Sequence, residues 1–161
     1  MEIRSATVQD VPGVLPMVAK TCALHESWDP AKYGFLEKPA ERYSRWLTAR
    51  ATDPRSVFLV ADAPASPASP AALAGFLIGT VEQEIPIYRI KEFAFLHDLW
   101  VEEAYRHEGI ARQMVMLAIE RFRELGVKQV RLDTAAANEA ARGLFKSCGF
   151  RPSCVEMLLE L

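Results

Sequence analysis

A polar turn in the second half of the chain has the residue types of an anion-binding site. Residues 95–101 form a mainly apolar run, residues 102–109 are mostly polar and end on Gly109, and an amphipathic segment begins at Ile110. This order predicts a buried strand, a glycine-containing turn and the first turns of a helix. Free backbone N–H groups and the positive end of the helix dipole then meet at one place, which binds phosphate or pyrophosphate. An ordinary strand-to-helix turn is the alternative interpretation.

Composition and charge are those of one ordinary globular domain over residues 1–161. Half of the residues are apolar, and 19 basic against 21 acidic residues give a formal net charge of −2. That balance does not indicate a nucleic-acid or anionic-membrane surface. No apolar run approaches the roughly 18 residues of a membrane helix, and residues 1–7 lack the pattern of a secretory signal. We therefore expect a cytoplasmic protein that binds neither nucleic acid nor membranes.

The cysteines indicate neither a disulfide framework nor a zinc site. There are three of them, Cys22, Cys148 and Cys154, and no two form a CxxC pair. An odd, widely spaced set of this kind is typical of free thiols in a reducing compartment. We expect no metal ion in the protein.

The pattern of apolar residues predicts an α/β chain, or α+β by a stricter definition, with a mixed six- to seven-stranded sheet flanked by about four helices. Strands are expected at residues 2–6, 57–61, 72–81, 93–101, 127–134 and 155–161, and helices from 11, over 39–51, from 110 to 125 and over 138–148. Pro16 is expected to kink or split the first helix, and residues 25–34 to form a loop. The Pro/Ala/Ser tract at 63–71 predicts a mobile hairpin loop. The strand–helix–strand unit at 94–134 requires a parallel pair.

Two segments in this order resemble the landmarks of the GNAT superfamily of acyl-CoA-dependent N-acyltransferases. The family's phosphate loop, Arg/Gln-x-x-Gly-x-Gly/Ala, is matched by Arg106, Gly109 and Ala111 after the strand that ends at residues 99–101. The second landmark, about thirty residues later, is matched by Asn138, Ala141, Phe145, Gly149 and Phe150. The opening residues 3–10 also resemble the family's first strand and helix cap. The resemblance covers most of the chain.

The resemblance implies acetyl-CoA as cosubstrate and assigns the residues that bind it. The pyrophosphate is expected on the backbone amides of His107, Glu108, Gly109, Ile110, Ala111 and Arg112. The side chains of Arg112 and Arg106 could add charge there, although a solvated surface arginine is as good an interpretation of either one. The pantetheine arm is expected to pair with the main chain of Leu99, Trp100 and Val101. Asn138 and Phe145 are expected beside this arm, and Asn138 also suits a helix N-cap.

Acyl transfer to an amine needs a base, and His97 is the candidate. Strand alternation places it on the same face as Phe95, Leu99 and Val101, with Asp98 on the opposite face in a structural role. It stands where polyamine-acetylating relatives carry a Glu in a similar Glu-Asp pair, and an imidazole titrates near neutral pH. A core histidine bonded to a carbonyl is the alternative. Rival bases in the same region are Glu82, Glu84 and Glu92.

The acid that protonates the departing thiolate is missing from its usual place. The family usually has a tyrosine at the position of Phe145, which has no proton to give. Cys148, three residues further on, could substitute, although a buried structural thiol is the stronger interpretation. Otherwise the thiolate takes its proton from water.

The resemblance implies an N-acetyltransferase that moves an acetyl group directly from acetyl-CoA to a primary amine of a small molecule or protein. A catalytically silent acyl-CoA-binding module is the alternative, because of Phe145. A Rossmann-type nucleotide-binding protein is a third and weaker one, because the glycine turn falls past mid-chain. Residues 22–50 and 82–92 are expected to form the side of the site that binds the acceptor amine. The aromatic residues of the first segment are expected mainly in core or lid packing: Trp28, Tyr33, Phe35, Tyr43 and Trp46. A homodimer is compatible with this sequence.

Overall fold

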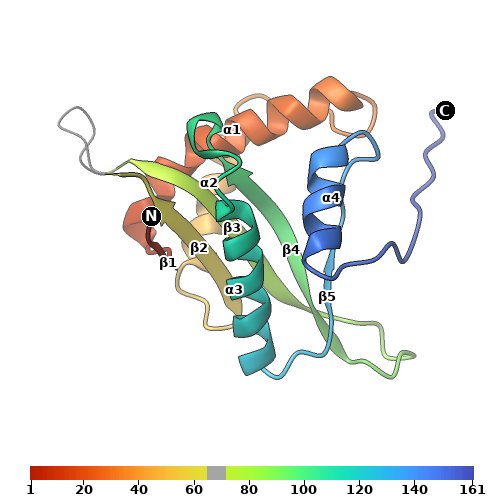
Figure 1. Ribbon diagram of the computed structural model, residues 1–161. Helices are drawn as coiled ribbons and strands as arrows, with labels where there is room; N and C mark the ends of the chain where they lie inside the picture. Colours follow the sequence, from red (N-terminus) through yellow and green to blue (C-terminus); the bar gives the residue numbers. More distant parts are fainter. Residues whose placement is uncertain (65–71) are drawn as a thin grey trace.

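The computed structural model describes residues 1–64 and 72–161, which form a five-stranded mixed sheet between two pairs of helices (Figure 1). The strands are β1 (Ile3–Ser5), β2 (Ser56–Asp62), β3 (Leu73–Gln83), β4 (Glu92–Val101) and β5 (Val130–Leu132). The helices are α1 (Val11–Trp28), α2 (Pro39–Arg50), α3 (Ile110–Glu124) and α4 (Glu139–Ser147), with short 3-10 turns η1 (Val8–Asp10) and η2 (Glu103–Tyr105). The strands lie in chain order, antiparallel except for the parallel pair of β4 and β5. The α/β class and the parallel pair are confirmed.

The sheet has a separate apolar cluster on each face because alternate residues of its strands point to opposite sides. On one face Phe58, Phe76 and Ile78 pack with α1 and α2. On the other face Leu59 and Leu77 pack with α3, and Phe145 of α4 joins the edge of that cluster. Within the described ranges, no helix is long and apolar enough to cross a membrane.

Helix α1 is longer and more continuous than its sequence predicts. It runs through Pro16 without a break and ends at Trp28, so the loop prediction is wrong for residues 25–28. The apolar residues Val14, Met17 and Val18 are buried on the sheet, and we infer that this packing outweighs the hydrogen bond that the proline removes. His25 stacks on Tyr33 with ring centroids 4.8 Å apart, which stabilises the end of the helix.

The predicted final strand is wrong. Residues 155–161 form neither a helix nor a strand, so the described residues form five strands instead of six or seven. Alternation of apolar residues shows which segment can enter a sheet, but a strand also needs a neighbour to pair with. In the predicted loop at 63–71, residues 65–71 lie outside the described residues; strands β2 and β3 flank it as expected.

Strand β4 contains a bulge at His97, and the bulge resets its alternation. Ile78 of β3 pairs with Asp98 and the next residue, Gly79, pairs with Leu96, so His97 has no partner in the register. An extra residue of this kind turns the side chains that follow it to the other face. A Cβ on Gly79 would lie 2.9 Å from the Phe95 carbonyl oxygen, so the close approach at the bulge requires a glycine.

Candidate functional site

The turn between β4 and α3 has the backbone of an anion-binding loop. Gly109 caps α3 at φ 80°, and His107 has φ 67°, so the chain makes two left-handed steps before the helix begins. The first helical hydrogen bond runs from the Gln113 amide to the Gly109 carbonyl oxygen. Among the described residues, none of the main-chain nitrogens of residues 107–112 donates to a protein acceptor. Residues 107–109 are exposed, so this end of α3 presents free donors and a positive dipole to solvent.

The side chain of Arg106 ties this loop to the end of β4. Its Nε donates to the Val101 carbonyl oxygen at 2.9 Å, and its guanidinium lies 4.9 Å from the centre of the Trp100 ring. Arg106 therefore has a structural role that its sequence position did not predict. Arg112 lies exposed in the first turn of α3, on the same end of the helix as the free amides.

One edge of β4 is open next to this loop. Strand β5 pairs with β4 only from Ala94 to Leu96, and β4 continues to Val101. The Glu102 amide bonds to the Ala74 carbonyl oxygen on the β3 side. Because main-chain groups alternate between the two edges of a strand, those of Leu99 and Val101 face the open edge. An extended chain could add there as a further strand.

His97 lies on the α1–α2 face of the sheet, at the start of the open part of β4. Its Nε2 is 2.7 Å from Thr80 Oγ1, and Thr80 in turn donates to Glu82 Oε1. Trp46 and Phe95 flank the imidazole at 5.1 Å between ring centroids. Burial lowers the pKa of His97, and the nearby Asp98 and Glu82 carboxylates offset part of that effect. The ring is therefore neutral at pH 7 and can accept a proton.

Because of the bulge, the predicted faces are wrong for Asp98 and for two of the residues that were expected to share the face of His97. His97 shares a face with Phe95, as expected, but Leu99 and Val101 lie in the cluster on the α3 side. Asp98 lies on the same face as His97, where Tyr43 of α2 donates to its Oδ2 at 2.8 Å. Burial raises the pKa of Asp98, and burial beside this carboxylate also raises the pKa of Tyr43. This bond joins α2 to β4.

Two of the three rival bases are held in ion pairs elsewhere. Glu84 pairs with Arg131 at 2.6 Å and Glu92 with Arg55 at 2.7 Å. Only Glu82 lies near the imidazole, 3.7 Å from His97 Nε2. Among the carboxylates predicted for this region, Glu82 is therefore the one that the structure brings to His97.

Comparison with known proteins identifies the family. Residues 22–150 match the model of the acetyltransferase (GNAT) family. This chain belongs to that family. It is 30% identical over 89 residues to the uncharacterized N-acetyltransferase YycN of Bacillus subtilis, covering 55% of this chain and 54% of that protein. It is 31% identical over 75 residues to human N-acetyltransferase 8, covering 47% of this chain and 33% of that one. The chain thus spans about half or less of these relatives.

A solved structure has the same fold as this GNAT chain. A mutant of the BH1408 protein from Bacillus halodurans matches 100% of this chain and 99% of its own, with a TM-score of 0.82 and 23% sequence identity. At that identity, the likeness shows the fold alone.

The second landmark of this GNAT chain is built around α4. Asn138 caps the helix, and its Oδ1 accepts from the Ala141 amide at 3.1 Å, as the N-cap prediction requires. Phe145 packs edge-on against Phe150 with centroids 5.5 Å apart and joins the core cluster. A place for Asn138 and Phe145 beside the pantetheine arm stays a prediction. Cys148, half-buried, also packs against that cluster.

Two contacts of the candidate site were not predicted from the sequence, that of Thr80 with His97 and that of Tyr43 with Asp98. Thr80 is buried and carries the hydroxyl that contacts His97. A lone threonine in a strand has no sequence signal for this role, because the pairing of β3 with β4 creates it. Within the described ranges, no three His, Cys, Asp or Glu side chains gather in a way that could hold a metal ion.

Proposed function

We propose that this GNAT chain is an acetyl-CoA-dependent N-acetyltransferase that moves an acetyl group directly to a primary amine of a small molecule or protein. The observation that carries the proposal is the arrangement of three features along one strand. A neutral, half-buried imidazole lies in the β4 bulge, an open main-chain edge follows it, and free amides lie in the loop after β4. These are the parts needed for the base, the pantetheine arm and the pyrophosphate.

The phosphate side of the proposal rests on the backbone of residues 107–112. Six consecutive amides without protein acceptors can donate to the oxygens of a pyrophosphate, and the dipole of α3 favours the negative charge. The exposed side chain of Arg112 adds a cation at the same end of the helix. Bound acetyl-CoA supplies the reactive thioester.

The pantetheine side of the proposal rests on the edge of β4. Arg106 already occupies the Val101 carbonyl oxygen. The main-chain groups left for the arm are therefore the N–H and C=O of Leu99 and the N–H of Val101. This assignment makes the backbone, and not the side chains, the binding partner.

The base in the proposal is His97 through its Nδ1. The Thr80 hydroxyl has one proton, which it gives to Glu82, so it can only accept from His97 Nε2–H. That tautomer leaves a lone pair on Nδ1 for the proton of the attacking amine. The amine nitrogen bonds to the acetyl carbon, the carbon–sulfur bond breaks, and the thiolate takes its proton from water because Phe145 has none.

The test is a binding and transfer experiment with the purified chain. We expect calorimetry to show CoA binding, and mass spectrometry to find an acetylated product when acetyl-CoA is offered with a panel of polyamines, aminoglycosides and peptides. Absence of CoA binding at millimolar concentration would refute the proposal. Tight CoA binding without transfer to any amine would instead favour the silent acyl-CoA-binding module.

A further inference from the structure

The loop between β4 and α3, residues 102–109, is held at its start by the side chain of Glu102. Lys20 Nζ of α1 donates to both carboxylate oxygens of Glu102, at 2.7 and 2.8 Å. The indole Nε1 of Trp100 donates to one of the same oxygens at 3.4 Å. The Glu102 side chain is 23% exposed, so the ion pair is partly shielded from water. One carboxylate therefore joins α1, the end of β4 and the loop.

The same contacts continue along the loop to Arg106. The ring of Trp100 takes part in two of them, because its N–H meets Glu102 and its face meets the guanidinium of Arg106, 4.9 Å from the ring centre. The six free amides of residues 107–112 follow Arg106 directly. A chain of contacts thus runs from α1 through Glu102 and Trp100 to the residue before these amides.

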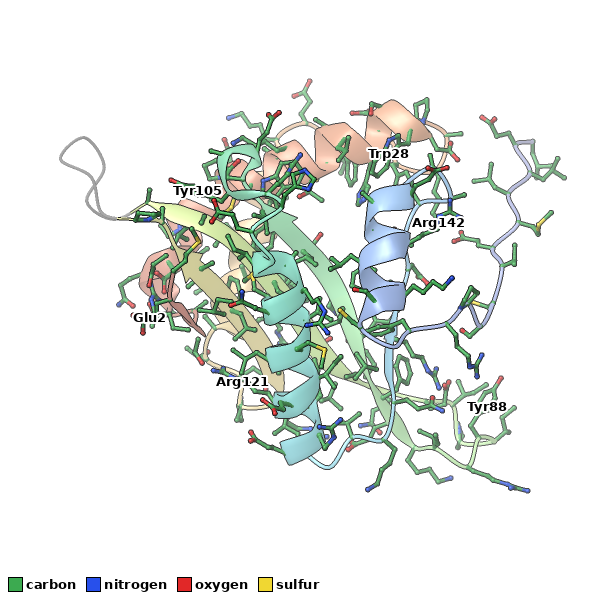
Figure 2. All side chains as sticks on the ribbon, viewed as in Figure 1. Glu2, Trp28, Tyr88, Tyr105, Arg121 and Arg142 are labelled. Carbon is green, nitrogen blue, oxygen red and sulfur yellow. The ribbon has the colours of Figure 1, made fainter. Side chains whose placement is uncertain are left out.

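Helix α1 is a firmly packed support for this chain of contacts. Its side toward the sheet buries Val14, Met17 and Val18, so a shift of the helix would expose apolar surface. Lys20 lies three residues after Met17, at the edge of that packed side. Figure 1 shows the loop beside α1, and Figure 2 labels Tyr105 of the loop there. The position of α1 thus determines where the start of the loop lies.

The charge of Glu102 has the wrong sign for a direct role at an anion site. Like charges repel, so a carboxylate at the start of this loop opposes the binding of a pyrophosphate to the amides that follow. Lys20 neutralises that charge, which requires two flexible side chains to be ordered. The pair is therefore explained by its effect on the loop, and not by attraction of a ligand.

We propose that Glu102, paired with Lys20, is a positioning residue that holds the β4–α3 loop in the conformation that binds acetyl-CoA. A loop that is ordered before binding loses less conformational entropy when the ligand arrives, which strengthens binding without a new contact. The inference rests on the proposed function, because this loop is the proposed pyrophosphate site. It assigns no chemical step to either residue.

The first test measures CoA binding to Glu102→Ala by calorimetry. Removal of a negative charge alone would tighten the binding of an anion, whereas loss of the positioning contact should weaken CoA binding about two- to fivefold, the range of a partly exposed ion pair. Glu103→Ala is the matched control, because Glu103 is exposed on the same loop. It should bind CoA as tightly as the parent or more tightly. In turnover assays Glu102→Ala should raise the KM for acetyl-CoA by the same factor and leave kcat unchanged.

The second test asks whether Glu102 acts through Lys20. Lys20→Met should weaken CoA binding to a similar extent, and the double variant should be no weaker than either single variant, because the contact is already lost. Additive losses would overturn the role of the pair.

Two further results would overturn the positioning role. One is CoA binding by Glu102→Ala as tight as that of the parent or tighter, even with a lower urea midpoint, since that is the result of a purely structural pair. The other is an equal loss of CoA affinity in Glu102→Ala and Glu103→Ala. Absence of CoA binding by the parent chain would refute the proposed function, and this inference with it.

Discussion

At the scale of single residues, the site depends on where the β4 bulge puts His97. The imidazole lies on the same face as Phe95, the face covered by α1 and α2, where Trp46 and Thr80 contact it, and the bulge turns Asp98 to that face as well. Burial there keeps the ring neutral, since the charged form would lose its hydration. Thr80 and Glu82 then fix which nitrogen carries the proton. We infer that Thr80 acts by positioning His97.

The first prediction at this scale is a loss of activity without a loss of cosubstrate binding. His97→Ala should lower kcat by about 10²- to 10⁴-fold, the usual contribution of a general base, while calorimetry still detects CoA binding. Because burial lowers the pKa of His97, kcat/KM should stay level near pH 7. It should fall as the pH drops through that lowered pKa, below about 6.5, where the ring takes up a proton.

Thr80 variants provide the control for this prediction. Thr80→Val removes the hydroxyl and should lower kcat and change the pH profile, whereas Thr80→Ser keeps the hydroxyl and should restore both. Unchanged turnover in His97→Ala would remove the histidine from the mechanism. Glu82→Gln would then be the next variant, since Glu82 is the rival base that lies 3.7 Å from the imidazole.

At the scale of elements, the proposed acetyl-CoA site combines the start of α3 with the open edge of β4. The helix supplies amides only because its first turn has no side-chain cap, so the donors stay free for a ligand. Gly109 makes this possible through its left-handed φ of 80°, which a residue with a Cβ adopts only with strain. Crowding is not the reason, because a Cβ there would meet nothing closer than 3.7 Å. The glycine is thus required by the backbone and not by crowding.

Gly109→Ala tests whether the turn before α3 binds CoA, and Gly126→Ala is its matched control for backbone strain. Both glycines have φ near 80°, at the start and just after the end of α3. Either alanine should lower the free energy of unfolding by roughly 1–2 kcal/mol, because the left-handed conformation is strained for a residue with a Cβ. Only Gly109→Ala should also weaken CoA binding in calorimetry. Equal CoA affinity in the two variants would contradict a pyrophosphate site at this turn.

At the scale of the whole molecule, one sheet joins two apolar clusters. Phe76 belongs to the cluster under α1 and α2, and Phe122 of α3 to the opposite one, and both are fully buried. Because β2, β3 and β4 contribute to both clusters, neither face can lose its packing without disturbing the other. We expect the described parts of the chain to unfold as one cooperative unit. A cytoplasmic location stays a prediction from composition.

The prediction at this scale compares Phe76→Ala with Phe122→Ala. Each should lower the free energy of unfolding by about 3–5 kcal/mol, the usual result of emptying a buried phenylalanine site. Urea unfolding followed by circular dichroism and by tryptophan fluorescence should give coincident single transitions for both variants. Two separate transitions would show that the faces unfold independently.

The sequence by itself determined the features that depend on neighbours along the chain. The order of strands and helices from β1 to α4, the glycine turn before α3 and the capping of α4 by Asn138 follow from periodicity and cap chemistry, which act over a few residues. The same local pattern, together with the resemblance, was enough for the family. The local pattern was not enough at α1, where packing on the sheet keeps the helix continuous past Pro16 to Trp28.

Only the tertiary structure decided the features that depend on the pairing of distant segments. The register of β3 against β4 creates the bulge, and with it the face of Asp98, the contact of His97 with Thr80 and the separation of Leu99 from His97. One inserted residue reverses every later side chain, and nothing in the sequence of β4 alone records it. Residues 155–161 have the alternation of a strand for the same local reason, but they join no sheet, because a strand also depends on the edge that it meets.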